Sequence, residues 1–244
     1  MSGHSKWATI KRKKAATDAA RGKIFTKLIK EISISARDGG GDPNGNPRLR
    51  LAIQNAKANN MPQENIMRAI KKGTGELEGV RYEEINYEAY APHGIALILE
   101  CVTDNRNRTV AELRHLISRN NGNLVESGAV AWMFDRKGVV TINKENHTED
   151  EVMEVILDYG ADDLREEGEY FEVVCPVENF EKVRKAVEDN KFKIENASLQ
   201  YIPKDNIKLD KKASEDVIKC IEVMEEHDDV QNVFSNADFH ESIQ

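Results

Sequence analysis

The sequence predicts an α+β protein in which a helical N-terminal domain is followed by two α+β domains, one of them ferredoxin-like and inserted into the other. Apolar residues recur at helical spacing through residues 1–75, and the pattern changes to that of strands from Arg81. Residues 131–203 then alternate in the order βαββαβ, which is the order of a ferredoxin-like unit. The predicted domains are residues 1–75, residues 76–130 with 208–244, and residues 131–207.

The helices of the first domain are predicted from apolar spacing and from turn-forming residues. Between Thr17 and Arg37 an apolar stripe lies on one helical face, formed by Ile24, Phe25, Leu28, Ile29 and Ile32. The opposite face is basic, with Lys23, Lys27, Lys30 and Arg37, and Ile34 breaks the pattern there. The segment GGGDPNGNP, residues 39–47, ends this helix, and Pro47 and Pro62 each begin another.

The strands of the second and third domains come next. Residues 82–102 predict a hairpin with its turn at residues 92–94, followed by a helix that stops at Gly122. In the third domain a strand is expected around AWMF and GVVTI, and the capping-box spacing of Thr148 and Glu151 predicts a helix start. The last helix and strand have no partners of their own, so we expect them to complete the sheet of the second domain.

Charge is divided unevenly along the chain. Residues 1–75 contain 16 Lys and Arg against 5 Asp and Glu, a net +11, whereas the remainder contains 19 against 38, a net −19. Such asymmetry indicates a polyanionic partner for the basic end. The acidic part would keep the rest of the chain away from nucleic acid.

The sequence indicates no enzyme, cofactor, metal site or small-molecule substrate. The six histidines share no metal-ligand spacing, and neither a dinucleotide fingerprint nor a Walker-type phosphate loop occurs. Two acidic clusters lack the pattern of a calcium loop, so we expect solvated acidic faces. These clusters are Asp162, Asp163, Glu166 and Glu167, and Glu225, Glu226, Asp228 and Asp229.

Cysteine usage favours the cytoplasm. Cys101, Cys175 and Cys220 are widely spaced and form no CxxC pattern, which argues against a disulfide framework. The sequence shows neither a long apolar run nor the apolar core of a signal peptide, so no membrane partner is expected. A basic, Ala-rich beginning also occurs in organelle transit peptides, and composition alone leaves that alternative open.

A basic run provides the main candidate for nucleic-acid contact. Lys11, Arg12, Lys13 and Lys14 are consecutive, and Asp18 is the only acidic residue before Glu31. Their long side chains could follow phosphates on both sides of an inserted helix. Lys6, Arg21, Lys23, Lys27 and Lys30 widen the patch, and Arg48, Arg50, Lys57, Arg68, Lys71 and Lys72 are secondary candidates.

Two further features have open interpretations. Trp7 could stack on an exposed base, or it could anchor the first helix on Phe25 and Ile29. In DNRNRT, residues 104–109, Asp104 or Asn105 could cap the following helix. Arg106 and Arg108 would then lie beside the N-terminal amides of that helix, which is an anion-binding arrangement.

Several long motifs together resemble the YebC/PmpR family over essentially the whole chain. They are MSGHSKWATIKRKKAATDAARGKIFTKLIKEI, GGGDPNGNPRLR, MPQENIMRAIKKGTG, TDNRNRT and SGAVAWMFDRKG. The resemblance implies a helical domain followed by two α+β domains. Because the first motif begins at residue 1, it also weakens the transit-peptide alternative. The matching positions for nucleic-acid binding are His4, Ser5, Lys6, Trp7, Lys11, Arg12, Lys13, Lys14, Arg48, Arg50, Arg106 and Arg108.

The expected function is a cytoplasmic, non-enzymatic, nucleic-acid-binding regulator of gene expression. Bacterial members of the family are designated DNA-binding transcriptional regulators, and other members are described as translation factors acting on the ribosome. The partner is therefore duplex DNA or ribosomal RNA, and the sequence shows no helix-turn-helix or heptad zipper that would favour DNA. A further alternative is a protein-interaction module in which the basic domain docks onto the acidic domains of the same chain.

Overall fold

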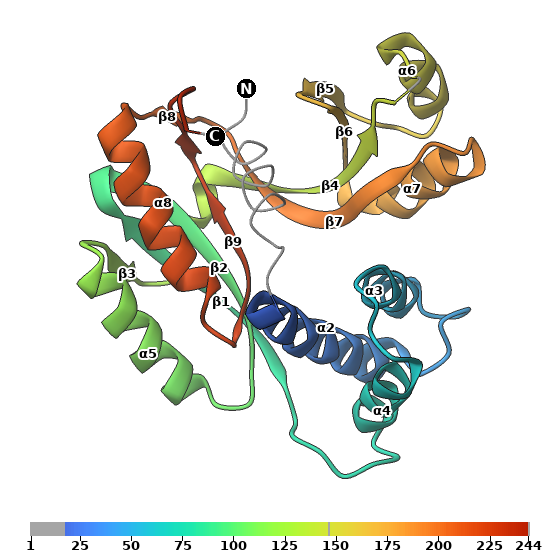
Figure 1. Ribbon diagram of the computed structural model, residues 1–244, viewed down its shortest axis with the longest axis horizontal. Helices are drawn as coiled ribbons and strands as arrows, with labels where there is room; N and C mark the ends of the chain where they lie inside the picture. The colour runs from blue at the N-terminus through green and yellow to red at the C-terminus, as the bar shows by residue number, and fades with distance from the viewer. Residues whose placement is uncertain (1–17, 146, 244) are drawn as a thin grey trace.

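The computed structural model describes residues 18–145 and 147–243. Figure 1 shows a group of helices from the N-terminal part of the chain beside two separate sheets with helices. We call the helical group domain 1, the sheet that contains both early and late strands domain 2, and the sheet between them in sequence domain 3. The predicted α+β class and the inserted arrangement are confirmed.

Domain 1 consists of α2 (Asp18–Gly39), α3 (Pro47–Ala58) and α4 (Gln63–Thr74). Its core contains Ile32 of the predicted stripe, with Leu49 and Ile66 from the other two helices. Gly73 lies where α4 crosses α2, because a Cβ there would be 2.2 Å from the carbonyl oxygen of Ser33. The three helices therefore pack closely along the apolar side of α2.

The glycine-rich loop between α2 and α3 is held by one buried side chain. The Asn46 Oδ1 caps α3 by accepting from the Leu49 N–H at 3.0 Å. Its Nδ2 donates to the carbonyl oxygens of Ser35 at 2.7 Å and Gly40 at 2.9 Å. Asn46 therefore joins the end of α2 to the start of α3.

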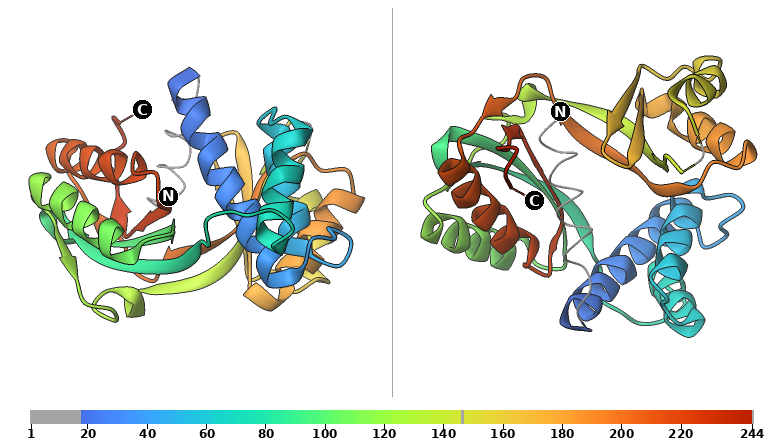
Figure 2. Two further views of the ribbon diagram at one scale, coloured as in Figure 1. Left: turned by 90° about the horizontal axis from the view of Figure 1, so that it is seen from below. Right: turned by 45° about the horizontal axis from the view of Figure 1, so that its top comes forward.

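Domain 2 is a four-stranded antiparallel sheet in the order β3-β1-β2-β9. Its elements are β1 (Glu83–Ala91), β2 (Ile95–Thr103), α5 (Arg106–Arg119), β3 (Asn123–Val125), α8 (Lys211–Glu225) and β9 (Val230–Ser235). Figure 2 shows α5 and α8 on the same face of this sheet, and both helices contribute to its main core. Strand β9 pairs with β2, as expected for the last strand, whereas β3 was not predicted.

Domain 3 has the strand order β5-β6-β4-β7, which is the order of a ferredoxin-like fold. Its elements are β4 (Phe134–Asn143), α6 (Glu149–Leu157), β5 (Asp163–Glu167), β6 (Tyr170–Cys175), α7 (Phe180–Asp189) and β7 (Ile194–Pro203). Both hydrogen bonds of the predicted capping box at Thr148 and Glu151 are present. The expected strand at AWMF is wrong in part, because residues 131–133 form the short 3-10 helix η2 (Ala131–Met133) and the strand begins at Phe134.

The three domains keep separate main cores and meet through smaller contacts. The long strands β4 and β7 pair from Phe134 with Pro203 onward and extend from domain 3 back to domain 2 (Figure 1). Their ends pack on the second face of the domain 2 sheet, where Phe134 lies with Ile98 and Phe234. Leu51 of α3 packs against the core of domain 3. Two short strands that were not predicted, β8 (Ile207–Lys208) and β10 (Ala237–Asp238), pair in parallel where the chain returns from domain 3 to domain 2.

Candidate nucleic-acid interface

The predicted nucleic-acid residues fall into two groups. His4, Ser5, Lys6, Trp7, Lys11, Arg12, Lys13 and Lys14, together with the side chain of Arg21, lie outside the described residues, and their role stays a prediction. Those that the structure describes lie on α2, at the start of α3 and at the start of α5. Each of the described ones contacts a partner within the chain.

Three lysines of α2 contact the carboxyl end of α8. The Nζ atoms of Lys23 and Lys27 donate to the carbonyl oxygens of Glu226 at 3.2 Å and Glu225 at 3.0 Å. Lys30 Nζ donates to the carbonyl oxygen of Asp228 at 2.8 Å. We call Lys23, Lys27 and Lys30 the lysine row. The last turn of α8 contains no basic residue, so the lysine row supplies the positive charge that a helix carboxyl end favours.

Lys30 and Asp229 form a buried ion pair between domains 1 and 2. Lys30 Nζ lies 2.6 Å from Asp229 Oδ1, and the two residues are only 6% and 3% exposed. Lys30 was expected on an open basic face and Asp229 on a solvated acidic face, and both expectations are wrong. They are wrong because that side of α2 is covered by domain 2. Ile34, one turn further along the same side, is buried as well.

The second carboxylate oxygen of Asp229 is bound by the TDNRNRT segment. Its Oδ2 accepts from Arg108 at 2.8 Å, from the Thr109 hydroxyl at 2.7 Å and from the Thr103 hydroxyl at 3.2 Å. Burial raises the pKa of Asp229, but the donors from Lys30, Arg108 and Thr109 outweigh it and hold the pKa well below its usual range.

The predicted anion-binding arrangement at the start of α5 therefore contains an anion from the same chain. Asn105 caps α5, since its Oδ1 accepts from the Arg108 N–H at 3.0 Å, as the sequence allowed. The Arg108 guanidinium also pairs with Asp104 at 2.8 Å. Arg106 takes no part in binding Asp229 and pairs with Glu83 at 2.8 Å.

The arginines that follow the glycine-rich loop are also paired. Arg48 forms ion pairs with Glu31 at 2.8 Å and with Glu84 of β1. Arg50 donates to the carbonyl oxygen of Pro43 at 3.1 Å and approaches Glu181 of domain 3 at 3.9 Å. Arg48 therefore links α3 to α2 and to domain 2, and Arg50 links α3 to the glycine-rich loop and to domain 3.

Other basic side chains of domain 1 remain open to solvent. Lys57, Lys71 and Lys72 are exposed, and none of them forms an ion pair with another residue between positions 22 and 243 that the structure describes. Arg68 is exposed but pairs with Glu64 at 2.7 Å. Lys57, Lys71 and Lys72 are thus better placed for an external phosphate than the lysine row is.

The sequence analysis did not identify Trp132 of the SGAVAW segment, residues 127–132, or Glu88 of β1, which binds the backbone of that segment. Glu88, only 6% exposed, accepts hydrogen bonds from the backbone N–H groups of Gly128, Val130 and Ala131 at 2.6, 2.6 and 2.8 Å. Burial raises the pKa of Glu88, but these three donors lower it below its ordinary value. The loop presents Trp132, which is 65% exposed. An acidic residue within a strand gave no indication of this role.

The acidic cluster of domain 3 is largely paired within the chain. Asp162 pairs with Lys137 at 2.7 Å, Asp163 pairs with Arg165 at 2.7 Å, and Glu166 pairs with Lys144. Asp162, Asp163 and Glu166 nevertheless remain exposed, as expected of a solvated acidic face, and the expectation is wrong only for Glu167. Glu167 is buried.

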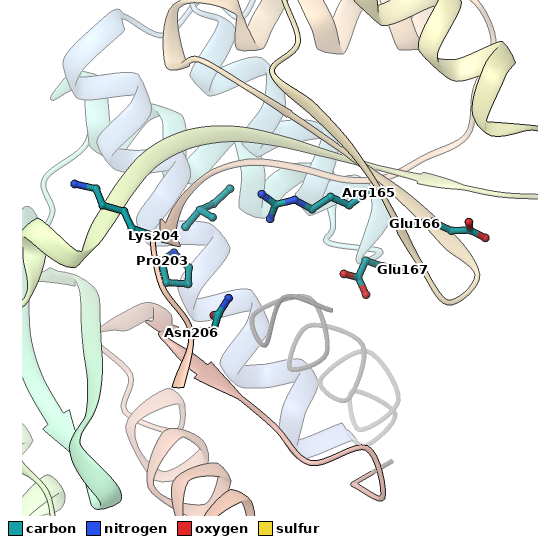
Figure 3. Close-up of a pocket in the computed structure, with 7 residues that line it drawn as sticks. Arg165, Glu166, Glu167, Pro203, Lys204 and Asn206 are labelled. Atoms are coloured by element: carbon teal, nitrogen blue, oxygen red, sulfur yellow. The ribbon is translucent and has the colours of Figure 1, made fainter. Parts of the chain in front are cut away.

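A hollow next to this cluster has mixed charge. It has a volume of about 460 Å³ and is lined by Arg165, Glu166, Glu167, Ile202, Pro203, Lys204 and Asn206. Figure 3 shows Lys204 and Glu166 at opposite ends of the hollow, so its charges do not converge on one point. The hollow therefore offers no evident place for a single charged ligand.

The described residues include no cluster of metal ligands and no reactive thiol. Within positions 18–145 and 147–243 no group of three His, Cys, Asp or Glu side chains could hold a metal ion. Burial raises the pKa of the Cys175 and Cys220 thiols to about 11 and that of Cys101 to about 12, which keeps them protonated. No helix in this part of the chain is long and apolar enough to cross a membrane.

The fold and these contacts define a three-domain α+β protein whose basic helical domain docks on an acidic body. Residues 5–76 match the model of the TACO1/YebC protein N-terminal domain, and residues 82–237 match that of the TACO1/YebC second and third domain. The chain therefore belongs to the TACO1/YebC family.

Similar proteins and one similar solved structure support this family assignment. The chain is 56% identical to a probable transcriptional regulatory protein of Chlorobaculum parvum, over 100% of this chain and 97% of the relative. It is 57% identical to one of Chlorobaculum tepidum, again over 100% and 97%. A crystal structure of a conserved hypothetical protein from Aquifex aeolicus is 43% identical, with a TM-score of 0.87 over 94% of this chain and 95% of that one. The names of the two Chlorobaculum relatives support a family of regulators.

Proposed function

We propose that this protein is a non-enzymatic, nucleic-acid-binding regulator of gene expression that acts in the cytoplasm. The observation that carries the proposal is the division of charge, with a net +11 in residues 1–75 and a net −19 in the rest. A basic domain attached to an acidic body can approach a phosphate backbone from one side only. The relatives named probable transcriptional regulatory proteins support duplex DNA as the first candidate partner.

Within this proposal, domain 1 makes the contacts and phosphates supply most of the affinity. Lys11, Arg12, Lys13 and Lys14 would lie along the backbone together with Lys6, while the exposed Lys57, Lys71 and Lys72 extend the contact. His4, Ser5 and Trp7 are included among the proposed contact residues by family resemblance. We expect no cofactor, small-molecule substrate or membrane partner.

Ribosomal RNA or the ribosome is the second candidate partner, which would make the protein a translation factor. The observation that favours it is the docking of the lysine row on domain 2. A helix that entered the major groove of DNA would have to present such a row outward. Basic residues at helix ends and in loops suit the phosphates of a folded RNA.

The same docking also favours a third candidate, a protein-interaction module. In that case the basic domain serves to hold the body in shape, and the acidic domains bind a protein partner. Arg48 and Arg50, which join domain 1 to Glu84 and Glu181, are consistent with this role.

A competition experiment distinguishes the three candidates. The full-length protein is offered operator-type duplex DNA, random duplex DNA and ribosomal particles together, over a range of salt concentrations. Preference for one DNA sequence supports a transcriptional regulator, and indifference to DNA sequence with sedimentation on ribosomes supports a translation factor. Failure to bind any of them at low salt would contradict nucleic-acid binding and leave the interaction module.

A further inference from the structure

The contact between domains 1 and 2 at the lysine row is polar. The main apolar cores of the two domains share no residue. Instead, three ammonium groups of α2 bind carbonyl oxygens at the end of α8, and Lys30 also binds Asp229. Polar interfaces of this kind between domains resemble transient protein contacts, and relative motion is expected of them.

The groups that bind the lysine row resemble a phosphate as hydrogen-bond acceptors. Carbonyl oxygens at a helix carboxyl end and an aspartate carboxylate are both negative acceptors, as phosphate oxygens are. One lysine row cannot lie against α8 and along a nucleic-acid backbone at the same time. Docking and external binding by these three residues therefore exclude each other.

The donors around Asp229 are arranged so that the pair can separate. All donors to Oδ2 belong to domain 2, namely Arg108, Thr103 and Thr109. Only Oδ1 depends on Lys30 of domain 1. When Lys30 leaves, the carboxylate keeps a cation and two hydroxyl donors, which avoids the large cost of an unpaired buried charge.

The three lysines differ in exposure, which indicates the order in which they would leave the end of α8. Lys23 is exposed, Lys27 is half-buried and Lys30 is buried. The link between domains 1 and 2, residues 76–82, forms no helix or strand and is mostly exposed. Phosphates would therefore meet Lys23 first, and movement of domain 1 about this link would free the inner residues.

We propose that the lysine row and residues 225–229 form an electrostatic latch, which masks part of the nucleic-acid surface of domain 1 and opens when a phosphate backbone displaces the end of α8. This inference rests on the proposed function and adds its regulation. Binding then occurs in two stages, with the outer basic residues first and the lysine row after the latch opens.

A cleavable cross-link tests the latch without removing any basic residue. Gly22→Cys and Glu226→Cys introduce thiols at two exposed positions, and a Cβ at Gly22 meets no atom within 4 Å. The natural cysteines are buried, so a short bis-maleimide with a disulfide in its spacer joins the two new thiols selectively. The control is the same double variant capped with N-ethylmaleimide.

Mixed-sequence duplex DNA and ribosomal RNA are titrated in parallel. We expect the cross-linked protein to bind roughly tenfold or more weakly than the capped control, because three lysines stay masked, and reduction of the spacer should restore affinity. Equal affinity with and without the cross-link would overturn the latch alone. Absence of binding by the capped control would overturn the proposed function and the latch with it.

Spin labels on the same two cysteines provide a second measurement that needs no cross-link. Addition of the nucleic acid that binds should lengthen the distance between the labels. A distance distribution that stays unchanged while the nucleic acid is bound would show that domain 1 remains docked, which contradicts the latch.

Discussion

Lys30 Nζ lies 2.6 Å from Asp229 Oδ1 in a buried ion pair that joins the basic helical domain to the sheet of domain 2. Around this pair, the TDNRNRT segment supplies Arg108, Thr103 and Thr109 to the same carboxylate. Two segments that looked like separate nucleic-acid contacts in the sequence thus meet at one aspartate. Asp229 is therefore one of the groups that hold domain 1 against domain 2.

Removal of Asp229 should destabilise the protein more than removal of Lys30. Asp229→Ala leaves Lys30 buried without its counter-charge and takes the acceptor from Arg108, so we expect a loss of about 3–5 kcal/mol in the free energy of unfolding. Lys30→Met leaves Asp229 with its domain 2 donors and should cost less. Urea unfolding followed by circular dichroism measures both, and equal losses would show that the domain 2 donors do not compensate the carboxylate.

The stabilisation from Asp229 should disappear at acidic pH. The pKa of Asp229 in the folded protein lies below its unfolded value of about 3.9. The ionised carboxylate therefore stabilises the fold fully above that value, and the stabilisation is lost as the pH falls from there toward the folded pKa. The difference in free energy of unfolding between wild type and Asp229→Asn should be constant from pH 7 to 5 and shrink below pH 4. A difference that stays constant to pH 3 would be inconsistent with this assignment.

Glu88 should fix the orientation of Trp132. Glu88→Gln replaces a carboxylate that accepts three backbone N–H groups, and we expect a loss of roughly 2–3 kcal/mol in the free energy of unfolding. The chain has two tryptophans, so Trp7→Phe leaves Trp132 as the only one. Its fluorescence anisotropy should fall in the Glu88→Gln variant. Glu126→Gln, at an exposed position of the same loop, is the matched control and should change neither quantity.

Much of the fold could be predicted because local patterns determine it. Phe25, Leu28, Ile29 and Ile32 of the predicted stripe pack in the core of domain 1, and the capping box at Thr148 marks the start of α6. The short strands β3, β8 and β10 were missed, because their pairing depends on residues that are distant in sequence. Such strands leave little periodicity to detect.

The candidate site was harder to predict than the fold. Periodicity shows that Lys30 lies outside the core of its own domain, but it cannot show that another domain covers it. The segment around Arg108 was correctly interpreted as an anion-binding helix start, yet the anion proved to be Asp229. Asp229 is the last residue of the acidic stretch EEHDD, residues 225–229, and nothing local distinguishes the buried Asp229 from its exposed neighbour Asp228. Only the tertiary arrangement makes that distinction.

The measurement that tests nucleic-acid binding by domain 1 most directly is the salt dependence of the binding constant. A variant with Lys11, Arg12, Lys13 and Lys14 all replaced by Ala is compared with wild type. A control in which Lys182, Lys185, Lys211 and Lys212 are replaced by Ala removes the same charge from exposed positions elsewhere. We expect the slope of log K against log salt to become shallower by about 0.9 for each phosphate of duplex DNA that the variant no longer neutralises, with the control unchanged. A wild-type slope in the variant would contradict the account.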